Sequence, residues 1–386
     1  MKKINLFFIT ISFLVLLSSC KKKDLGISSN QKVFSIPLFR QSLMNQLNGS
    51  VGYTIVINQN GKLVDTASSG ISFINPSGGG FTPVSIYHDI CIASVTKPIT
   101  AMAAIKLLEQ KGILLDFPIG SWLPNRWQKS KDISEVTFRQ LLTHTSGIRQ
   151  SNPDWDTLKT MVSMPITNSK DYAYANANFG LFRLLIPKLN DASDFNVQEQ
   201  SMGNSQFSTW VSLKYIQLMH ELVFSPAMIS DVRCNIDPNK PNMQAFNESN
   251  NLNFTPVSFG DLTERSGSGG FYLTPVEMAQ LMAFLVHTSS ILSVSQKEKM
   301  DDGLLGWDPD DSYETSYGRV YGKDGLFYRD FDSNGEVSLG DAGLQTWVGK
   351  FPNKVELVIT VNSIGSSARS LSNISRTAYL NAWVNK

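Results

Sequence analysis

Three short patterns in this sequence place reactive side chains at spacings that could support chemistry. The stretch CIASVTKPIT sets Ser94 three residues before Lys97, which puts both side chains on one face if the segment is helical. A serine hydroxyl attacks poorly until a base removes its proton, and a lysine in a dry pocket has a lowered pKa and can be that base. The same spacing also arises by chance, as a surface lysine near a serine that caps a helix. Spacing alone therefore leaves both interpretations open.

The context of this pair favours the chemical interpretation. CIA precedes it and AMAAIKLLEQ follows TKPIT, so Lys97 lies among apolar neighbours and not in a charged stretch. Further along the chain come YAN, from Tyr174 to Asn176, and KDG, from Lys323 to Gly325. Taken alone, Tyr174 could equally be a packed aromatic residue and Asn176 a turn residue. It is the order and spacing of the three patterns, and not any single residue, that favour a catalytic site.

In this order, SxxK, YxN and KxG resemble the serine β-lactamase-like hydrolases: class C β-lactamases, D-alanyl-D-alanine carboxypeptidases and their esterase relatives. The resemblance covers most of the chain, from the first hairpin to the last helix. It implies an acyl-enzyme mechanism that requires no cofactor, with Ser94 as nucleophile and Lys97 and Tyr174 as catalytic partners. It further implies substrate contacts from Asn176, Lys323 and Gly325, and oxyanion donors in the backbone N–H groups of Ser94 and Leu326.

The charged residues expected near Tyr174 affect both its protonation and the substrates that we expect. The resemblance sets Lys97 and Lys323 near Tyr174, and two positive charges would favour its phenolate, which could then be a base for the serine. Lys323 by itself favours a substrate with a free carboxylate. However, Asp324 stands where the β-lactamases commonly have threonine, and its carboxylate would partly offset that charge and could repel an anionic substrate.

The implied substrates are small molecules or peptides: D-alanyl-D-alanine peptide ends, β-lactams or small esters and amides. An esterase without β-lactam activity is one alternative. A non-catalytic binding or sensor domain on the same fold is another. A net charge of +1 gives no global field to attract nucleic acid.

Other polar motifs are interpreted as structural. His144, in HTSGI, suggests a serine–histidine pair, but the resemblance places this motif below the site and uses lysine and tyrosine as bases. GSGG at 267–270 lacks the strand–turn–helix context of a nucleophile elbow, and we expect a tight turn into a helix near Thr274. MHELVF has only the first histidine of the zinc-binding pattern HExxH.

Hydrophobic periodicity predicts the elements that position these residues. TIVIN and KLVDT flank Asn60-Gly61, which predicts a β-hairpin with a type I′ turn. Further patterns predict helices over 31–48, 94–110, 136–148, 177–189, 208–222, 274–290 and 367–385, the fourth of them ending near Pro187. They also predict strands over 318–328, 343–352 and 355–363. Strands thus lie near both ends. We expect an α/β (α+β) fold in which an antiparallel sheet from the N- and C-terminal segments is flanked by helices, with a mostly helical lobe inserted over roughly 115–265.

The first thirty residues predict export. MKK, the apolar stretch INLFFITISFLVLL and then LSSC are typical of a bacterial lipoprotein signal over 1–19, with Cys20 as the lipidated residue. An ordinary secretory signal cut nearby is the alternative. Residues 20–30 would form a flexible tether and 31–386 the hydrolase domain. We therefore expect a protein anchored to a membrane of the bacterial cell envelope. Whether Cys91 and Cys234 form a disulfide in that compartment stays open.

A polar stretch after the KDG pattern resembles a calcium loop. RDFDSNGEVSLGDAG has a glycine at the sixth position and oxygen-bearing residues around it. It ends in aspartate where an EF-hand has glutamate, and predicted strands flank it, so a polar β-hairpin is the alternative. A structural Ca²⁺ here would stiffen a loop beside the site. The candidate ligands are Asp330, Asp332, Asn334, Glu336 and Asp341.

Overall fold

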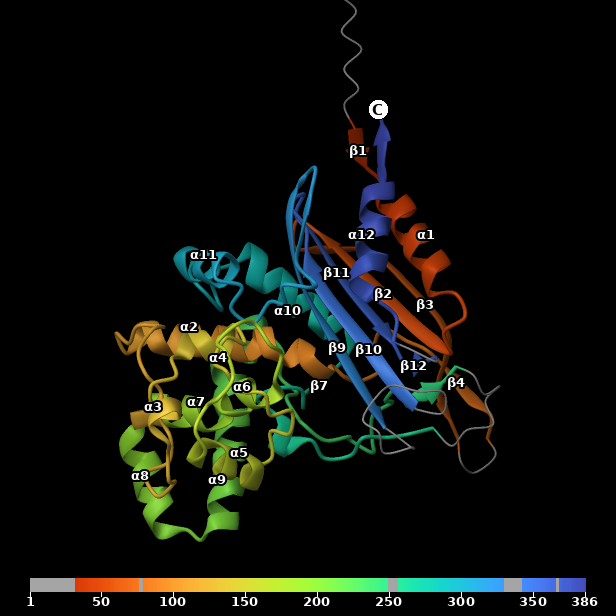
Figure 1. The fold of residues 1–386 in the computed structure, drawn as a ribbon. Helices are drawn as coiled ribbons and strands as arrows, with labels where there is room; N and C mark the ends of the chain where they lie inside the picture. Colours follow the sequence, from red (N-terminus) through yellow and green to blue (C-terminus); the bar gives the residue numbers. More distant parts are fainter. Residues whose placement is uncertain (1–31, 76–78, 249–255, 330–341, 366–367) are drawn as a thin grey trace, which may run out of the picture.

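An antiparallel sheet built from both ends of the chain forms the centre of one lobe (Figure 1). The computed structural model describes residues 32–75, 79–248, 256–329, 342–365 and 368–386. The five main strands run in the order β9-β10-β11-β2-β3. They are β2 (Gly52–Gln59), β3 (Lys62–Ile74), β9 (Gly318–Arg329), β10 (Ala342–Lys350) and β11 (Val355–Val361).

The first hairpin has the predicted turn, with Asn60 at φ 52° and Gly61 at φ 73°. Strand β8 (Tyr313–Thr315) pairs with the first residues of β9. From Tyr321 onward, β9 pairs with β10 and presents its other edge to the helical lobe. Short strands complete the architecture: β4 (Phe81–Pro83), β6 (Phe246–Asn247) and β12 (Ser363–Ile364) extend the sheet, and β5 (Ile90–Cys91) pairs with β7 (Tyr272–Leu273).

Helices cover both faces of the sheet, and this explains the nearly continuous apolar sequence of its central strands. Ile55 and Ile57 of β2 pack against α1 (Ile36–Leu47) and α12 (Leu371–Asn381), whereas Val56 between them belongs to the core on the opposite face. That face is covered by α10 (Pro275–His287). Helix α10 begins as predicted, because Thr274 and Glu277 form a reciprocal capping box.

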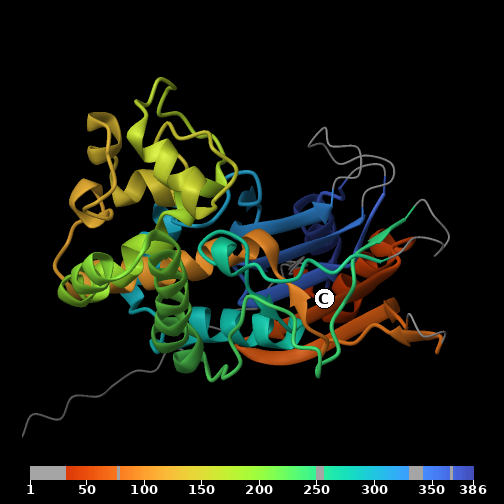
Figure 2. The ribbon, with the colours of Figure 1, turned by 90° about the horizontal axis from the view of Figure 1, so that it is seen from below.

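A helical lobe lies beside the sheet, and α2 (Thr96–Gln110) runs from the sheet into it (Figures 1 and 2). Almost all of α2 is buried, so its sequence is apolar on every side. The turn η1 (Ala93–Val95) precedes it. The other helices are α3 (Lys131–Ser134), α4 (Phe138–Leu142), α5 (Trp155–Ser163), α6 (Asn176–Gly180), α7 (Phe182–Asn190), α8 (Ala192–Ser201), α9 (Asn204–Met219) and α11 (Val294–Asp302), with short turns η2 (Gly120–Trp122), η3 (His220–Phe224), η4 (Ser225–Ala227) and η5 (Thr263–Arg265).

The predicted fold class is confirmed, with local differences. Strand β1 (Lys32–Phe34) pairs with β13 (Trp383–Asn385), a contact between chain ends that no local pattern could predict. Helix α7 continues past Pro187 to Asn190, because buried packing along the helix outweighs the missing N–H. Cys91 and Cys234 are buried free thiols, so they do not form a disulfide.

None of the helices in the described ranges is both long enough and apolar enough to cross a lipid bilayer. The predicted signal, Cys20, the tether and the proposed calcium loop at 330–341 lie outside the described residues.

Candidate active site

Ser94 lies in the turn that enters α2, and strand β9 passes very close to that turn. Ala93 has φ 47°, a left-handed conformation that is unusual for a residue with a Cβ. A Cβ atom on Gly325 would lie 2.7 Å from the Ile92 carbonyl oxygen and 3.0 Å from Ala93 Cβ. The glycine of the KDG pattern is therefore needed for the close approach of β9 to the nucleophile segment, and it does not line the cavity beside Ser94.

The structure brings together Ser94, Lys97 and Tyr174. Ser94 Oγ lies 2.5 Å from the Tyr174 hydroxyl oxygen and 2.9 Å from Lys97 Nζ. Lys97 Nζ also donates to Asn176 Oδ1 at 2.8 Å and to the Ser268 carbonyl oxygen at 2.7 Å. The three predicted catalytic side chains and the predicted asparagine therefore form one hydrogen-bonded cluster.

Lys97 is fully buried, and its surroundings favour the neutral amine. Burial, followed by the charge of Lys323, lowers the pKa of Lys97 well below its usual value. A neutral amine has two N–H donors and one lone pair. The acceptors on Asn176 and Ser268 use the two donors, which leaves the lone pair for the hydroxyl of Ser94.

Tyr174 differs from our expectation, because the structure favours its phenol and not its phenolate. Burial of the hydroxyl raises the pKa of Tyr174 to about 12, although Lys323 and the hydrogen bond with Ser94 act in the opposite direction. The expectation counted two lysine charges. One of these lysines favours its neutral form, and Asp324 and Asp308 oppose the effect of the other.

His144 packs against Tyr174 and hydrogen-bonds to neighbouring residues, as expected for a structural histidine. Its Nδ1 accepts the backbone N–H of Ala175 at 3.2 Å and lies 3.1 Å from the side-chain nitrogen of Asn178. Its ring lies 4.6 Å from the ring of Tyr174. Burial lowers the pKa of His144 to about 3, so the ring stays neutral and can accept these bonds.

The edge of β9 presents a row of backbone donors towards the site. Gly322 N–H donates to Ser312 Oγ and Asp324 N–H to Asp311 Oδ2, so both point away from β10. Because alternate residues of a strand point their N–H groups the same way, the N–H of Leu326 also points outward. Leu326 lines the cavity beside Ser94, where the predicted oxyanion donor should be.

Lys323 is not placed as a ligand for a substrate anion. Its side chain is 2% exposed, and its Nζ lies 2.6 Å from Asp324, 3.0 Å from Asp308 and 3.9 Å from Asp311. Burial disfavours the ammonium, but these carboxylates outweigh it and raise the pKa of Lys323 well above its usual value. The predicted substrate contact is therefore corrected: the charge of Lys323 is already neutralised by the protein.

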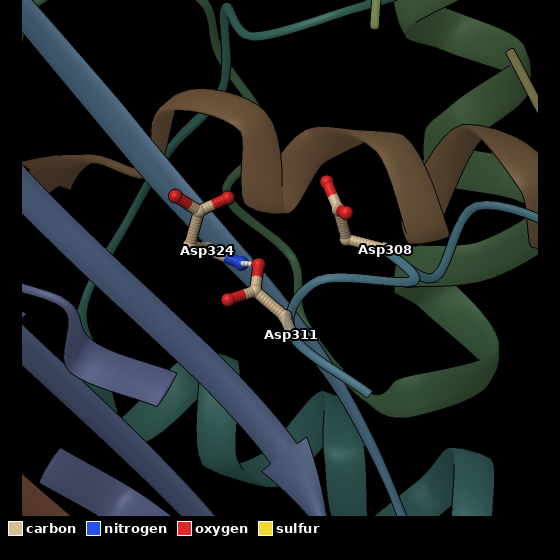
Figure 3. Close-up of side chains that lie close together, drawn as sticks. All are labelled: Asp308, Asp311 and Asp324. Atoms are coloured by element: carbon tan, nitrogen blue, oxygen red, sulfur yellow. Dashed lines mark hydrogen bonds between the residues drawn. The ribbon is translucent and has the colours of Figure 1, made fainter. Parts of the chain in front are cut away.

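The three carboxylates converge from β9 and from the loop before it (Figure 3). One oxygen from each lies within 4.8 Å of the others, a spacing that could hold a metal ion. The ammonium of Lys323 lies among them and supplies the positive charge instead. The bond from Asp324 N–H to Asp311, drawn dashed in Figure 3, fixes the loop against the strand.

A cavity of about 360 Å³ opens beside Ser94. Its walls include residues that the sequence did not single out, because they lie in loops without periodic patterns. Tyr172 donates to Asp308 at 2.9 Å across this wall. The only signal was the density of aspartates in WDPDD, shortly before β8 and β9. The lining residues are Ser94, Tyr172, Tyr174, Asn176, Asp308, Asp310, Asp311, Asp324 and Leu326.

A sheet flanked by helices, with a serine, a neutral lysine and a tyrosine at the junction of two lobes, defines a class of active-site-serine hydrolases. Comparison with known proteins agrees. A sequence profile described as Beta-lactamase matches residues 41–363, so this chain belongs to the β-lactamase family, a family of serine hydrolases that includes carboxypeptidases and esterases.

Individual relatives show how far the likeness extends. The esterase EstB of Burkholderia gladioli is 48% identical over 59 residues, which are 15% of each chain. A penicillin-binding protein of Bacillus subtilis is 32% identical over 124 residues, 26% of this chain and 25% of the relative. These alignments thus span a quarter or less of the relatives' lengths. A class C β-lactamase structure from Rhodobacter sphaeroides shares the fold, with a TM-score of 0.63, 12% identity and coverage of 89% of this chain and 98% of that one.

Proposed function

We propose that this protein is an exported serine hydrolase that cleaves small esters or amides through an acyl-enzyme on Ser94. One observation carries the proposal. Ser94 Oγ lies within hydrogen-bond distance of both Lys97 Nζ, at 2.9 Å, and the Tyr174 hydroxyl, at 2.5 Å. A nucleophile held between a base and a proton donor is what nucleophilic catalysis requires.

In the first half of the reaction, neutral Lys97 removes the proton of Ser94 as its oxygen attacks the substrate carbonyl. The carbonyl oxygen becomes an oxyanion, which the backbone N–H groups of Ser94 and Leu326 would stabilise. The phenol of Tyr174 then protonates the leaving group as the bond to the carbonyl carbon breaks. The ammonium of Lys97 then gives its proton to the Tyr174 phenolate, which restores the phenol and the neutral amine.

In the second half, water attacks the acyl-enzyme carbonyl. Lys97 is again neutral and accepts the proton of the water, directly or through Tyr174. Ser94 Oγ leaves and regains a proton, and the carboxylic acid product dissociates. Asn176 holds the amine through its side-chain oxygen, so that the lone pair stays directed at the serine.

Labelling with a fluorophosphonate tests this proposal, because the reagent reacts only with activated serines. We expect stoichiometric labelling on Ser94, identified by peptide mass spectrometry, and none in Ser94→Ala. Ser205→Ala, an exposed serine on α9, is the matched control and should label fully. Labelling that persists in Ser94→Ala would refute the nucleophile. A folded wild-type protein that never labels would favour the non-catalytic binding domain.

The substrate class follows from the environment of Lys323. Because its charge is balanced by three carboxylates, we favour small esters over β-lactams and D-alanyl-D-alanine ends, which carry a free carboxylate. Nitrocefin, a D-alanyl-D-alanine peptide and p-nitrophenyl butyrate, assayed side by side, test this order. Efficient turnover of nitrocefin or the peptide, with little turnover of the ester, would reverse it.

Export and anchoring form a separate part of the proposal, supported by the pattern of residues 1–20 alone. We expect Cys20 to carry acyl chains that hold the protein at a membrane of the cell envelope. Growth with an alkynyl fatty acid should label the protein, and Cys20→Ser should lose the label. A labelled Cys20→Ser variant, or an unlabelled wild type, would contradict the anchor.

A further inference from the structure

The cavity beside Ser94 has an acidic wall. Asp308, Asp310, Asp311 and Asp324 all line it. The buried ammonium of Lys323 contacts three of these groups. Even with one carboxyl group protonated, a single cation cannot balance the wall, which stays net negative.

No other charge in the catalytic cluster compensates this wall. Lys97 favours its neutral form, and its Nζ is bonded to Ser94, Asn176 and the Ser268 carbonyl. Asp310 is exposed at the rim, so its charge acts on whatever enters the cavity. A substrate anion would therefore meet repulsion without a compensating partner, whereas a substrate cation would be attracted.

The acidic wall lies on the side from which the leaving group departs. Tyr174 donates the proton to the leaving group in the mechanism above, so the leaving group must lie next to its hydroxyl. Lys323 Nζ is 5.2 Å from the centre of the Tyr174 ring, and Tyr172 bonds to Asp308 beside it. The carboxylates thus line the same cavity as the group that would protonate the leaving group.

We propose that this site selects substrates whose leaving group carries a positive charge, such as an amino alcohol or a quaternary ammonium alcohol, and rejects those with a carboxylate there. The inference rests on the proposed function and names its substrate class. The ring of Tyr172 contributes as well. It is 37% exposed and bonds to Asp308, and an aromatic face next to carboxylates is a favourable surrounding for an ammonium group.

Three butanoate esters that differ in the charge of the alcohol test the proposal. Butyrylcholine is cationic, 3,3-dimethylbutyl butanoate is its neutral isostere, and the butanoate ester of 3-hydroxypropanoic acid is anionic. Each reacts with water to give butyrate and its alcohol. We expect kcat/KM to fall from the cationic to the neutral to the anionic ester, with a cation-to-anion ratio of about tenfold or more at low salt.

Two variants assign the preference to the wall. Asp310→Asn removes a charge that does not contact Lys323 and should lower the cation-to-anion ratio about threefold. Asp324→Thr introduces the residue common in the β-lactamases, frees one side of Lys323 and should lower the ratio about tenfold. Asp156→Asn, an exposed aspartate on α5 away from this cavity, is the matched control and should leave the ratio unchanged.

The outcomes separate this inference from the proposed function. Ser94-dependent hydrolysis with equal rates for the three esters, or with the anionic ester preferred, would overturn the inference and leave the serine hydrolase intact. A cation-to-anion ratio that is unchanged in both Asp310→Asn and Asp324→Thr would also overturn it. If no ester acylates Ser94 under single-turnover conditions and no fluorophosphonate label forms, the proposed function fails and the inference fails with it.

Discussion

Two buried lysines lie close to one tyrosine ring, and the protein shifts their pKa values in opposite directions. Lys97 is 0% exposed and Lys323 is 2% exposed, so burial penalises the two charges about equally. Lys97 is bonded to a hydroxyl, an amide oxygen and a carbonyl oxygen. Lys323 is bonded to carboxylates instead. The charge of a buried lysine is thus decided by its hydrogen-bond partners, and the same residue type serves as a base at one position and as a structural cation at the other.

The largest expected effect is on catalysis, through the first lysine. Lys97→Met removes the base and should lower the rate of Ser94 acylation by about 10²–10⁴-fold. Because the substitution also leaves the buried acceptors on Asn176 and Ser268 without their donor, the free energy of unfolding should fall by about 1–3 kcal/mol. Stopped-flow acylation and urea denaturation measure the two quantities. Lys106→Met, on the same helix, is the control. Acylation at the wild-type rate in Lys97→Met would contradict the role of this lysine as the base.

For the second lysine, Lys323, the main expected effect is on the free energy of unfolding. Lys323→Met leaves Asp308, Asp311 and Asp324 without their cation, so the free energy of unfolding should fall by about 3–5 kcal/mol. Urea denaturation at neutral pH measures it. Adding Asp324→Asn to this variant should restore part of the loss, because one of the unpaired charges is then removed. If Lys323→Met is as stable as the wild type, the contrast between the two lysines is wrong.

A smaller effect concerns the pH dependence of stability at the second lysine. Burial and the neighbouring Asp324 raise the pKa of Asp311 from 3.8 to about 8. The folded protein therefore keeps a proton that the unfolded chain loses, and this contribution to stability fades as pH rises from about 4 towards 8. Asp311→Asn cannot lose a proton, so its unfolding free energy should vary less over that window. Equal slopes for the two proteins in urea titrations would contradict the assignment.

The smallest expected effect belongs to the sequence-predicted calcium loop that joins β9 to β10. Residues 330–341 follow the strand that carries Lys323, so bound Ca²⁺ would stiffen one end of that strand. EGTA should then lower the melting temperature by a few degrees, and added Ca²⁺ should restore it. Asp330→Asn with Asp332→Asn should abolish this response. A melting temperature that ignores EGTA would favour the polar hairpin.

Sequence patterns identified the groups that act through local spacing and missed those that act through tertiary contacts. SxxK, YxN and KxG could be read directly, and the Asn60-Gly61 hairpin and the capping box at Thr274 follow from local rules. The Ser268 carbonyl could not be foreseen, because a backbone acceptor leaves no trace in residue identity. The expectation of a phenolate at Tyr174 was wrong because it, too, depended on tertiary contacts.

That expectation treated Lys97 and Lys323 as equal charges, since a sequence shows which residues are ionisable but not what surrounds them. Asp308 and Asp311 lie in a loop without periodicity, and only the fold brings them to β9. Asp324 was recognised as a departure from the common motif because it is adjacent to Lys323 in the chain. The balance of charge therefore needed the structure, whereas the choice of candidate catalytic groups did not.

The outward edge of β9 limits how a polymer could approach this enzyme. Ser312 and Asp311 already accept the N–H groups of Gly322 and Asp324, so a polypeptide cannot lie along that stretch as an added strand. In the proposed mechanism a substrate presents its carbonyl near Leu326, beyond the blocked stretch. A short acyl group needs no backbone pairing there, whereas an extended chain could pair with β9 only from Leu326 onward.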